Sequence, residues 1–298
     1  MTHSVTSIKE ADMPKVGLVL SGGFAKGAYQ IGVLNAIKEV FGDEKEDNFK
    51  YISASSVGAL NAYAFAQNKV KVVEDMWRGL KFSGLRSFFS TAVRGPFVAE
   101  TVAEIYKDTQ SIKTDLYITC FNIKEGKLNY INLKDVEHEH EKDYLLASVA
   151  MPVLAYPVEV AGRKYVDGAL VDNIPVKPLM RHPFDYAIVV HFDNDNYVFE
   201  NDFFDSRLIK INFLDDNIIK NSLAFNRDSI AHMIKMGYDV SMAMFDTVFK
   251  NGTDDVEYIY EKNRFFNEFR GRRKTRLTGD VVVNNINKAM KRFISYRI

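Results

Sequence analysis

A glycine-rich loop and a serine-bearing turn carry the groups best suited to chemistry in this chain. The loop, residues 22–27, leads from a short apolar run into a predicted helix, so its backbone amides can face a developing negative charge. Ser56 lies between Ala54 and Gly58, where a second apolar run turns sharply into another predicted helix. An exposed hydroxyl beside an oxyanion-binding loop predicts acyl transfer, and a serine esterase is the leading hypothesis.

The glycine loop has other interpretations. A nucleotide-binding P-loop requires Lys-Ser or Lys-Thr after its last glycine, but Ala28 and Tyr29 follow Gly27. A dinucleotide fingerprint requires glycine at its middle position, where Phe24 stands. The remaining readings are an oxyanion hole and a turn that lets the helix pack close to the strand. The nearby serine favours the first.

The serine turn fits a nucleophile elbow, because the residues two before and two after the serine must be small. Ala54 and Gly58 satisfy this requirement around Ser56. Ser53 and Ser55 are rival hydroxyls without small residues at the same spacing. A serine that caps the following helix is the alternative for this turn.

A serine nucleophile needs a base, and the histidines do not mark one. His191 or His232 could complete a Ser-Asp-His triad, but no motif surrounds either. His138 and His140 lie in an acidic run that we interpret as a solvated surface rather than a metal site.

An aspartate is the better-marked base. Asp167 ends a predicted strand, and Gly168 after it allows close approach of a neighbouring backbone or substrate. Burial raises the pKa of a carboxyl from about 3.9 toward neutrality, which suits a general base. An ordinary Asp-Gly turn is the alternative. Asp172 and Asn173 are interpreted as turn or capping groups before Pro175.

Alternating elements must position these groups. We expect strands at residues 15–20, 49–53, 115–121, 127–133, 164–166, 186–192 and 208–213. We expect helices at residues 26–40, 57–67, 141–150 and 228–249, interrupted helical structure over 70–108, and a helix that Pro175 opens. This alternation predicts an α/β fold, with a mainly parallel central sheet between helical layers in a single domain.

Composition excludes several classes of protein. The 298 residues are 47% hydrophobic, enough for a sizeable core, and 39 basic side chains balance 39 acidic ones, so no overall field favours nucleic acid. Cys120 is the single cysteine, which excludes a disulfide framework. The sequence shows neither the apolar run of a signal peptide nor a stretch of about 18 apolar residues, the length that a membrane-spanning helix needs. We therefore expect a cytoplasmic protein whose contact with a membrane, if any, is peripheral.

Taken together, the three segments resemble the patatin-like phospholipase family. The match consists of the loop 22–27, the elbow 54–58 and Asp167-Gly168-Ala169, in the family's order and separation, within a similarity that covers about residues 15–191. The resemblance implies a patatin-like three-layer α/β/α domain at 15–215, a tail at 1–14 and a mostly helical C-terminal extension at 216–298.

The resemblance also implies an activity and residue roles. The expected reaction is hydrolysis of acyl esters in lipids by a Ser-Asp dyad, without metal or cofactor. Ser56 is the implied nucleophile and Asp167 the implied base. The implied oxyanion donors are the amides of Gly22, Gly23 and Phe24. Motif support comes from the basic loop residue and the small residues of the three segments, namely Lys26, Gly27, Ala54, Gly58, Gly168 and Ala169.

Two departures from the family pattern bear on activity. Ala54 replaces the first glycine of the elbow, and its methyl is small enough to be tolerated. Phe24 replaces a loop glycine, and if that position requires positive φ, a residue other than glycine is strained there; its ring can also cover the pocket and narrow the acyl site. A catalytically weak or inactive lipid-binding protein on the same fold is therefore the alternative.

Two basic segments are candidates for contact with anionic lipid. Residues 76–99 combine three arginines and one lysine with aromatic side chains and hold no acidic residue, whereas residues 262–276 hold seven basic residues and one acidic residue. A pair of core helices is the alternative for the first segment, and a solvated surface or an oligomer contact is the alternative for the second. The sequence does not indicate an oligomeric state.

Overall fold

The computed structural model describes most of the chain. It covers residues 14–42, 48–79, 97–152, 155–192, 197–213, 227–269 and 273–275. Within these ranges, no helix has both the length and the apolar character needed to span a membrane. The predicted compartment, peripheral membrane contact and domain boundaries stay predictions.

An eight-stranded sheet forms the centre of the fold. Its parallel part, in spatial order, consists of β3 (Asp115–Asn122), β2 (Phe49–Ala54), β1 (Val16–Leu20), β7 (Tyr186–His191) and β9 (Leu208–Asn212). Its antiparallel part adds β4 (Lys127–Asn132), β5 (Val158–Val160) and β6 (Arg163–Asp167) at the β3 end. The central strands β1 and β7 are buried along their whole length, as expected for a sheet that is covered on both faces.

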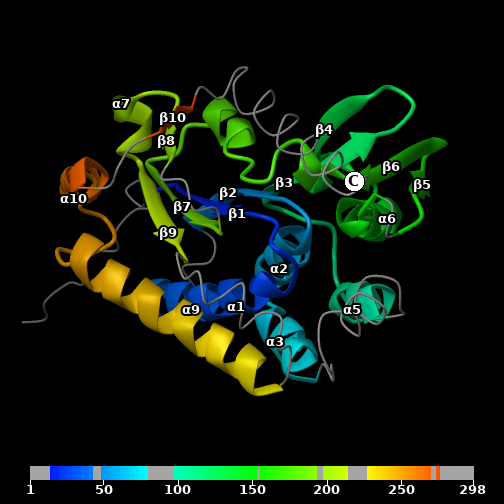
Figure 1. The fold of residues 1–298 in the computed structure, drawn as a ribbon, viewed down its shortest axis with the longest axis horizontal. Helices are drawn as coiled ribbons and strands as arrows, with labels where there is room; N and C mark the ends of the chain where they lie inside the picture. Colours follow the sequence, from blue (N-terminus) through cyan, green and yellow to red (C-terminus); the bar gives the residue numbers. More distant parts are fainter. Residues whose placement is uncertain are drawn as a thin grey trace, which may run out of the picture.

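Long helices cover one face of the sheet (Figure 1). They are α1 (Gly27–Phe41), α2 (Val57–Ala66), α3 (Val70–Gly79), α5 (Phe97–Tyr106), α6 (His138–Val149) and α9 (Arg227–Val248). Two glycines let α1 and α9 cross closely, because a Cβ on Gly32 would collide with the Ile234 carbonyl and one on Gly237 with the Tyr29 carbonyl. Leu18 on β1 belongs to the large hydrophobic core on this side.

Shorter elements cover the opposite face. They are the 3-10 helix Lys177–Arg181, α7 (Asp202–Asp205) and a two-stranded parallel sheet of β8 (Tyr197–Phe199) and β10 (Arg273–Thr275). The helix α10 (Val256–Phe269) lies at the β9 end of the sheet (Figure 1), where Ile259 joins the large core. Val19 and Val189 point into a second core on this side, packed against Leu179. Figure 1 shows α7 and the small sheet across the central strands from α1 and α9.

The predicted fold class is confirmed, with local corrections. The α6 helix begins at His138 rather than at residue 141, because Glu139 and Glu141 in its first turn complement the helix dipole. Pro175 does not open a helix. Asn173 is hydrogen-bonded to the glycine loop and the backbone stays irregular until the 3-10 helix, in which Pro178 occupies the first turn. The strands β5, β8 and β10, of three residues each, were not expected from the sequence.

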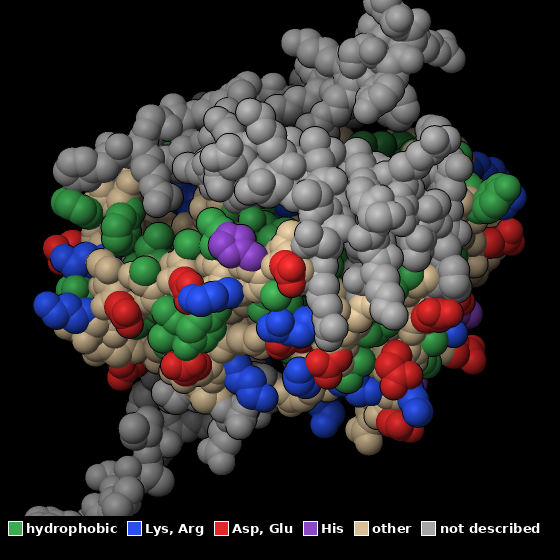
Figure 2. Space-filling view, turned by 60° about the horizontal axis from the view of Figure 1, so that its bottom comes forward, with side chains coloured by type: hydrophobic (Ala, Val, Ile, Leu, Met, Phe, Trp, Pro, Cys, Tyr) green, Lys and Arg blue, Asp and Glu red, His purple; other side chains and the backbone are tan. Residues whose placement is uncertain are grey.

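The surface near α9 carries both signs of charge. Figure 2, with the lower part of Figure 1 turned forward, shows acidic and basic side chains interspersed among hydrophobic ones. On α9 itself, Lys235 pairs with Asp239, and the Tyr238 hydroxyl donates to Glu39 on α1 at 2.6 Å. The described residues of this face therefore form no extended patch of a single charge (Figure 2).

Candidate active site

The glycine loop follows β1 and passes through one 3-10 turn, Phe24–Lys26, into α1. Phe24 adopts φ 53°, a left-handed conformation that disfavours side chains with a Cβ. Gly22 must be a glycine, because an added Cβ would lie 2.5 Å from the Asn173 Oδ1 and 2.9 Å from the Ser56 Cβ. Among the described residues, none accepts a hydrogen bond from the Gly23 amide.

Ser56 lies on a strained turn between β2 and α2. Its φ of 54° and ψ of −132° leave the regions that L-residues favour, as a nucleophile elbow requires. Gly58 lets the turn pack against β1, because an added Cβ would lie 2.5 Å from the Leu20 carbonyl oxygen. The Ser55 amide donates to that same oxygen at 3.0 Å. Ala54, buried at the end of β2, fills the first small position of the elbow.

The register of β3 brings the serine and the aspartate together. Ala54, the last residue of β2, is paired with Ile118 in a parallel ladder. Asp167, the last residue of β6, is paired with Cys120 in an antiparallel ladder. Because β4 occupies the other edge of β3, β2 and β6 run toward each other along one edge. Their ends therefore converge, which places the Ser56 side chain close enough to Asp167 to act on the pKa of its carboxyl.

Burial gives Asp167 the properties of a base. The side chain is 3% exposed, and desolvation raises its pKa to about 7, although hydrogen bonds from Ser56 and from the Ala169 amide act to lower it. The Ala169 amide donates to Asp167 Oδ1 at 2.8 Å. Gly168 fits against β3, where a Cβ would lie 2.7 Å from the Thr119 Cβ. The carboxyl can thus exchange its proton near neutral pH.

Of the rival groups, Ser55 is engaged in hydrogen bonds, and Ser53 and the two histidines lie elsewhere in the fold. The buried Ser55 hydroxyl lies 2.7 Å from the Thr119 hydroxyl and donates to the Asp172 carbonyl at 3.1 Å. Ser53 is buried within β2. His191 is buried at the end of β7, and His232 is exposed on α9. In the described part of the chain, no histidine hydrogen-bonds Ser56.

Buried and half-buried polar side chains, whose roles the sequence did not reveal, fix the glycine loop. The Asn173 Nδ2 donates to the Gly22 carbonyl at 3.2 Å, and the Gly22 amide donates to the Asn173 carbonyl at 3.3 Å. Gln30 donates to the Ser21 carbonyl at 2.7 Å. Asn61 on α2 donates to Gln30 at 2.8 Å and to the Gly27 carbonyl at 3.0 Å. The sequence feature that could have indicated the roles of Gln30 and Asn61 is an amide side chain on an otherwise apolar helix face.

Asp172 anchors the segment that follows the base. Its carboxylate accepts a hydrogen bond from the Tyr130 hydroxyl at 2.6 Å, and burial raises the pKa of both groups. Its carbonyl accepts from Ser55. This fits the sequence-based interpretation of Asp172 as a turn group. Asn173 is part of the same turn, but it also reaches across to the glycine loop.

Lys26 lies beside an aromatic ring at the end of the glycine loop. Its Nζ is 5.8 Å from the centroid of the Phe192 ring, and the same ring packs against Gly23, where a Cβ would lie 2.5 Å from it. Gly27 packs against Val57 of the elbow, at 2.8 Å from an added Cβ. Lys26 therefore contributes to the packing of the loop.

An apolar pocket opens beside Ser56. It lies among α2, α3, α5 and the segment after α6, and all of its lining residues are apolar except Ser56, Asn61 and Thr101. The apolar lining consists of Phe24, Val57, Leu60, Val73, Met76, Trp77, Phe97, Val98, Val149 and Met151. Phe24, 41% exposed, lies between this pocket and solvent. The pocket can hold a hydrocarbon chain whose polar end reaches Ser56.

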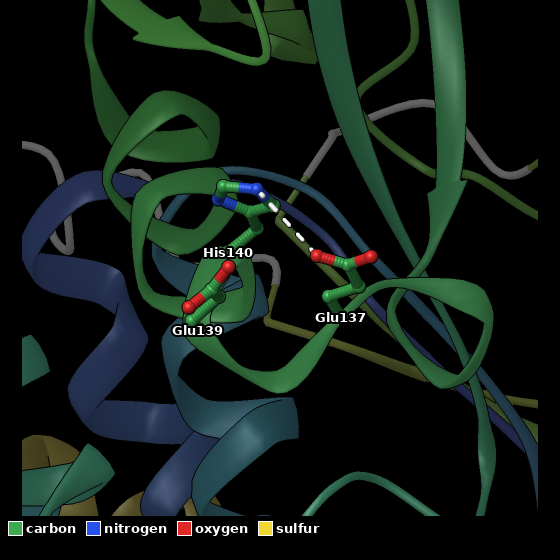
Figure 3. Close-up of side chains that lie close together, drawn as sticks. All are labelled: Glu137, Glu139 and His140. Atoms are coloured by element: carbon green, nitrogen blue, oxygen red, sulfur yellow. Dashed lines mark ion pairs between the residues drawn. The ribbon is translucent and has the colours of Figure 1, made fainter.

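The acidic run at the start of α6 forms a surface cluster. Figure 3 shows His140 paired with Glu137, at 4.0 Å, and Glu139 beside them. The ligand atoms of these three side chains lie within 4.8 Å of one another, and both carboxylates are exposed. Acidic groups at a helix N-terminus account for the cluster.

The two segments considered for lipid binding are only partly described. Residues 80–96 lie outside the described ranges, but Trp77 and Phe97 on either side of them face the pocket. In α10, Lys262 lies over the Tyr258 ring at 4.8 Å and pairs with Glu261. Binding of either segment to a membrane stays a prediction.

Comparisons with known proteins place the fold and the site in context. Residues 18–180 match the model of a family described as patatin-like phospholipase. The chain is similar to lysophospholipase NTE1 of Cryptococcus neoformans var. neoformans serotype D, with 28% identity over 184 residues, 59% of this chain and 11% of that protein. It is also similar to lysophospholipase nte1 of Aspergillus terreus, with 28% identity over 174 residues, 54% of this chain and 11% of that protein.

A bacterial relative and two solved structures are also similar. An NTE family protein of Mycobacterium bovis is 22% identical over 191 residues, which cover 61% of this chain and 50% of that protein. VipD from Legionella pneumophila gives a TM-score of 0.49 at 13% identity, over 94% of this chain and 75% of that chain. The type III effector ExoU gives a TM-score of 0.45 at 16% identity, over 78% of this chain and 53% of that chain. The chain spans about a tenth of the length of the fungal relatives it matches.

Proposed function

Because the chain belongs to the patatin-like phospholipase family, we propose that it is a serine lipid acyl hydrolase with a Ser56–Asp167 dyad. One observation carries the proposal. The Ser56 side chain, on a strained turn beside an apolar pocket, lies next to a buried aspartate whose pKa is raised to about 7. The lysophospholipase relatives support a lipid ester as the substrate.

The reaction proceeds in two steps on this geometry. Asp167 takes the proton of Ser56 while the serine oxygen attacks the ester carbonyl, and the carbonyl oxygen becomes an oxyanion. Protonated Asp167 returns the proton to the departing alcohol, which leaves an acyl-serine. Water, deprotonated by the same aspartate, then attacks the acyl-serine, and Ser56 regains its proton as the fatty acid is released. No step requires a metal or cofactor.

The loop supplies the oxyanion donors. We assign this role to the amides of Gly23 and Phe24, which stand at the start of the 3-10 turn that leads into α1. The Gly22 amide donates to the Asn173 carbonyl at 3.3 Å, so its predicted donor role is not part of the proposal. An oxyanion donor contributes about 10²–10³ in rate.

The apolar pocket is the proposed acyl site. Val98, half-buried on α5, lines it, whereas the adjacent Ala99 is exposed and does not. We expect Val98→Phe to lower kcat/KM for long-chain p-nitrophenyl esters by about tenfold and to leave the acetyl ester unchanged. Ala99→Phe, the matched control, should retain the wild-type preference for chain length. An equal loss on all chain lengths in Val98→Phe would reject this pocket as the acyl site.

A lipid-binding protein without appreciable catalysis is the second proposal, and Phe24 is the observation that favours it. Its ring lines the mouth of the pocket at a position where the family carries glycine. Binding of a lysophospholipid with no release of fatty acid, in a wild-type protein whose Ser56 does not react with acylating reagents, would select this alternative over the hydrolase.

A further inference from the structure

The geometry points to Asn173 as a positioning residue that holds the Gly23 amide toward the oxyanion. This inference rests on the proposed hydrolase function and extends it to a side chain outside the three motifs. Asn173 lies six positions beyond Asp167, on the segment that carries the base, and contacts the loop that carries the oxyanion donors.

The first step of the argument is the paired hydrogen bond between the two segments. The Asn173 Nδ2 donates to the Gly22 carbonyl at 3.2 Å, and the Gly22 amide donates to the Asn173 carbonyl at 3.3 Å. Both polar groups of Gly22 are therefore held by one residue. The glycine cannot be replaced without a clash, because an added Cβ would lie 2.5 Å from the Asn173 Oδ1.

The second step follows from the planarity of the peptide bond. The Gly22 carbonyl and the Gly23 N–H belong to one trans peptide unit and point in opposite directions. When Asn173 holds the carbonyl on one side, the Gly23 N–H must face the other side. That amide has no acceptor among the described residues, as expected for a donor kept for the oxyanion.

The third step is that the same turn also holds the elbow. The Asp172 carbonyl, one residue earlier, accepts a hydrogen bond from the Ser55 hydroxyl at 3.1 Å, next to the nucleophile. The turn at 172–173 therefore contacts the glycine loop and the serine elbow, and it continues the chain from Asp167. A rotation of the Gly22–Gly23 peptide is the motion that the Asn173 amide specifically prevents.

Two variants test the role of the side chain. We expect Asn173→Ala to lower kcat for a p-nitrophenyl ester by about 100-fold with little change in KM, because the donor is lost in the transition state. Asn173→Asp keeps the shape of the side chain but replaces the amide donor with an oxygen, and it should lose activity to a similar extent. Asn263→Ala on α10 is the matched control, because Asn263 also donates to a backbone carbonyl, that of Ser206, at 2.9 Å.

Two further readouts separate positioning from a general loss of structure. The affinity for an alkyl trifluoromethyl ketone, which forms a tetrahedral adduct with a serine, should fall with kcat in both Asn173 variants. The midpoint of the pH–rate profile of Asn173→Ala should stay at the wild-type value, because that substitution changes neither Asp167 nor the charge around it. Full kcat and full ketone affinity in a folded Asn173→Asp protein would overturn the inference and leave the proposed function standing. A wild type that neither hydrolyses esters nor binds the ketone would overturn both.

Discussion

Replacing Asp167 with asparagine should stabilise the fold at neutral pH while removing activity. The asparagine oxygen can still accept from the Ala169 amide, and its NH₂ can bond Ser56, so the substitution chiefly removes a buried charge. The carboxyl pKa is raised from 3.8 to about 7 in the folded protein. A shift of about three units corresponds to roughly 4 kcal/mol of stability lost once the group is ionised.

The sign of the effect follows from the direction of the shift. Because the folded-state pKa lies above the unfolded-state value, the contribution to stability is complete below about pH 4 and is lost as the pH rises to about 7. Only the wild-type protein, which keeps the carboxyl, loses this stability when the group ionises. The free energy of unfolding of Asp167→Asn, minus that of wild type, should therefore increase by about 2–3 kcal/mol between pH 5 and pH 8.

Urea denaturation at a series of pH values measures this difference. Asp172 also has a raised pKa, but it is present in both proteins and its contribution cancels in the comparison. Ser56→Ala is the matched control, since it is inactive by the same proposal yet retains the buried carboxyl of Asp167, so its stability should still fall between pH 5 and pH 8. A difference between Asp167→Asn and wild type that stays constant from pH 5 to pH 8 would refute the assignment of a raised pKa to this carboxyl.

Three further changes should give defined results. The kcat/KM of wild type should rise with pH and level off above about 7 as Asp167 loses its proton, and a flat profile from pH 5.5 to 8.5 would contradict this role. Phe24→Gly removes a side chain held at φ 53° beside the pocket and should raise kcat/KM for branched relative to linear acyl esters by about tenfold, whereas an unchanged ratio would dissociate Phe24 from specificity. Gly58→Ala places a methyl 2.5 Å from the Leu20 carbonyl oxygen and should destabilise the fold by about 1–3 kcal/mol in thermal denaturation, while Gly79→Ala, whose added methyl meets nothing within 4 Å, should not. Equal melting temperatures for the two glycine variants would argue against the close packing at Gly58.

The parts of the site that depend on local sequence could be predicted. A strand followed by a loop or turn and then a helix has a strong local pattern, and the apolar residues of β1, β2, α1 and α2 mark these elements within one or two residues. Ser56, the glycine loop and Asp167 were identified because each lies where such an element ends. The predicted sheet was also correct in its mainly parallel character.

The parts that depend on register could not be predicted. Nothing in the local sequence indicates that β2 and β6 share one edge of β3, although this pairing brings Asp167 to Ser56. The pocket could not be predicted either, because its lining comes mainly from three separate helices, α2, α3 and α5. Three-residue strands such as β5 are too short to show a period. Asn173 resembled an ordinary turn residue, because its partner lies 151 positions away in the sequence.

The central claim is that Ser56 is an activated nucleophile. The intact mass of the protein after reaction with a fluorophosphonate, measured on wild type and on Ser56→Ala, tests it most directly. The account predicts a single phosphonyl adduct on wild type and none on Ser56→Ala. A folded wild type that gains no mass, or an adduct that persists in Ser56→Ala, would contradict it.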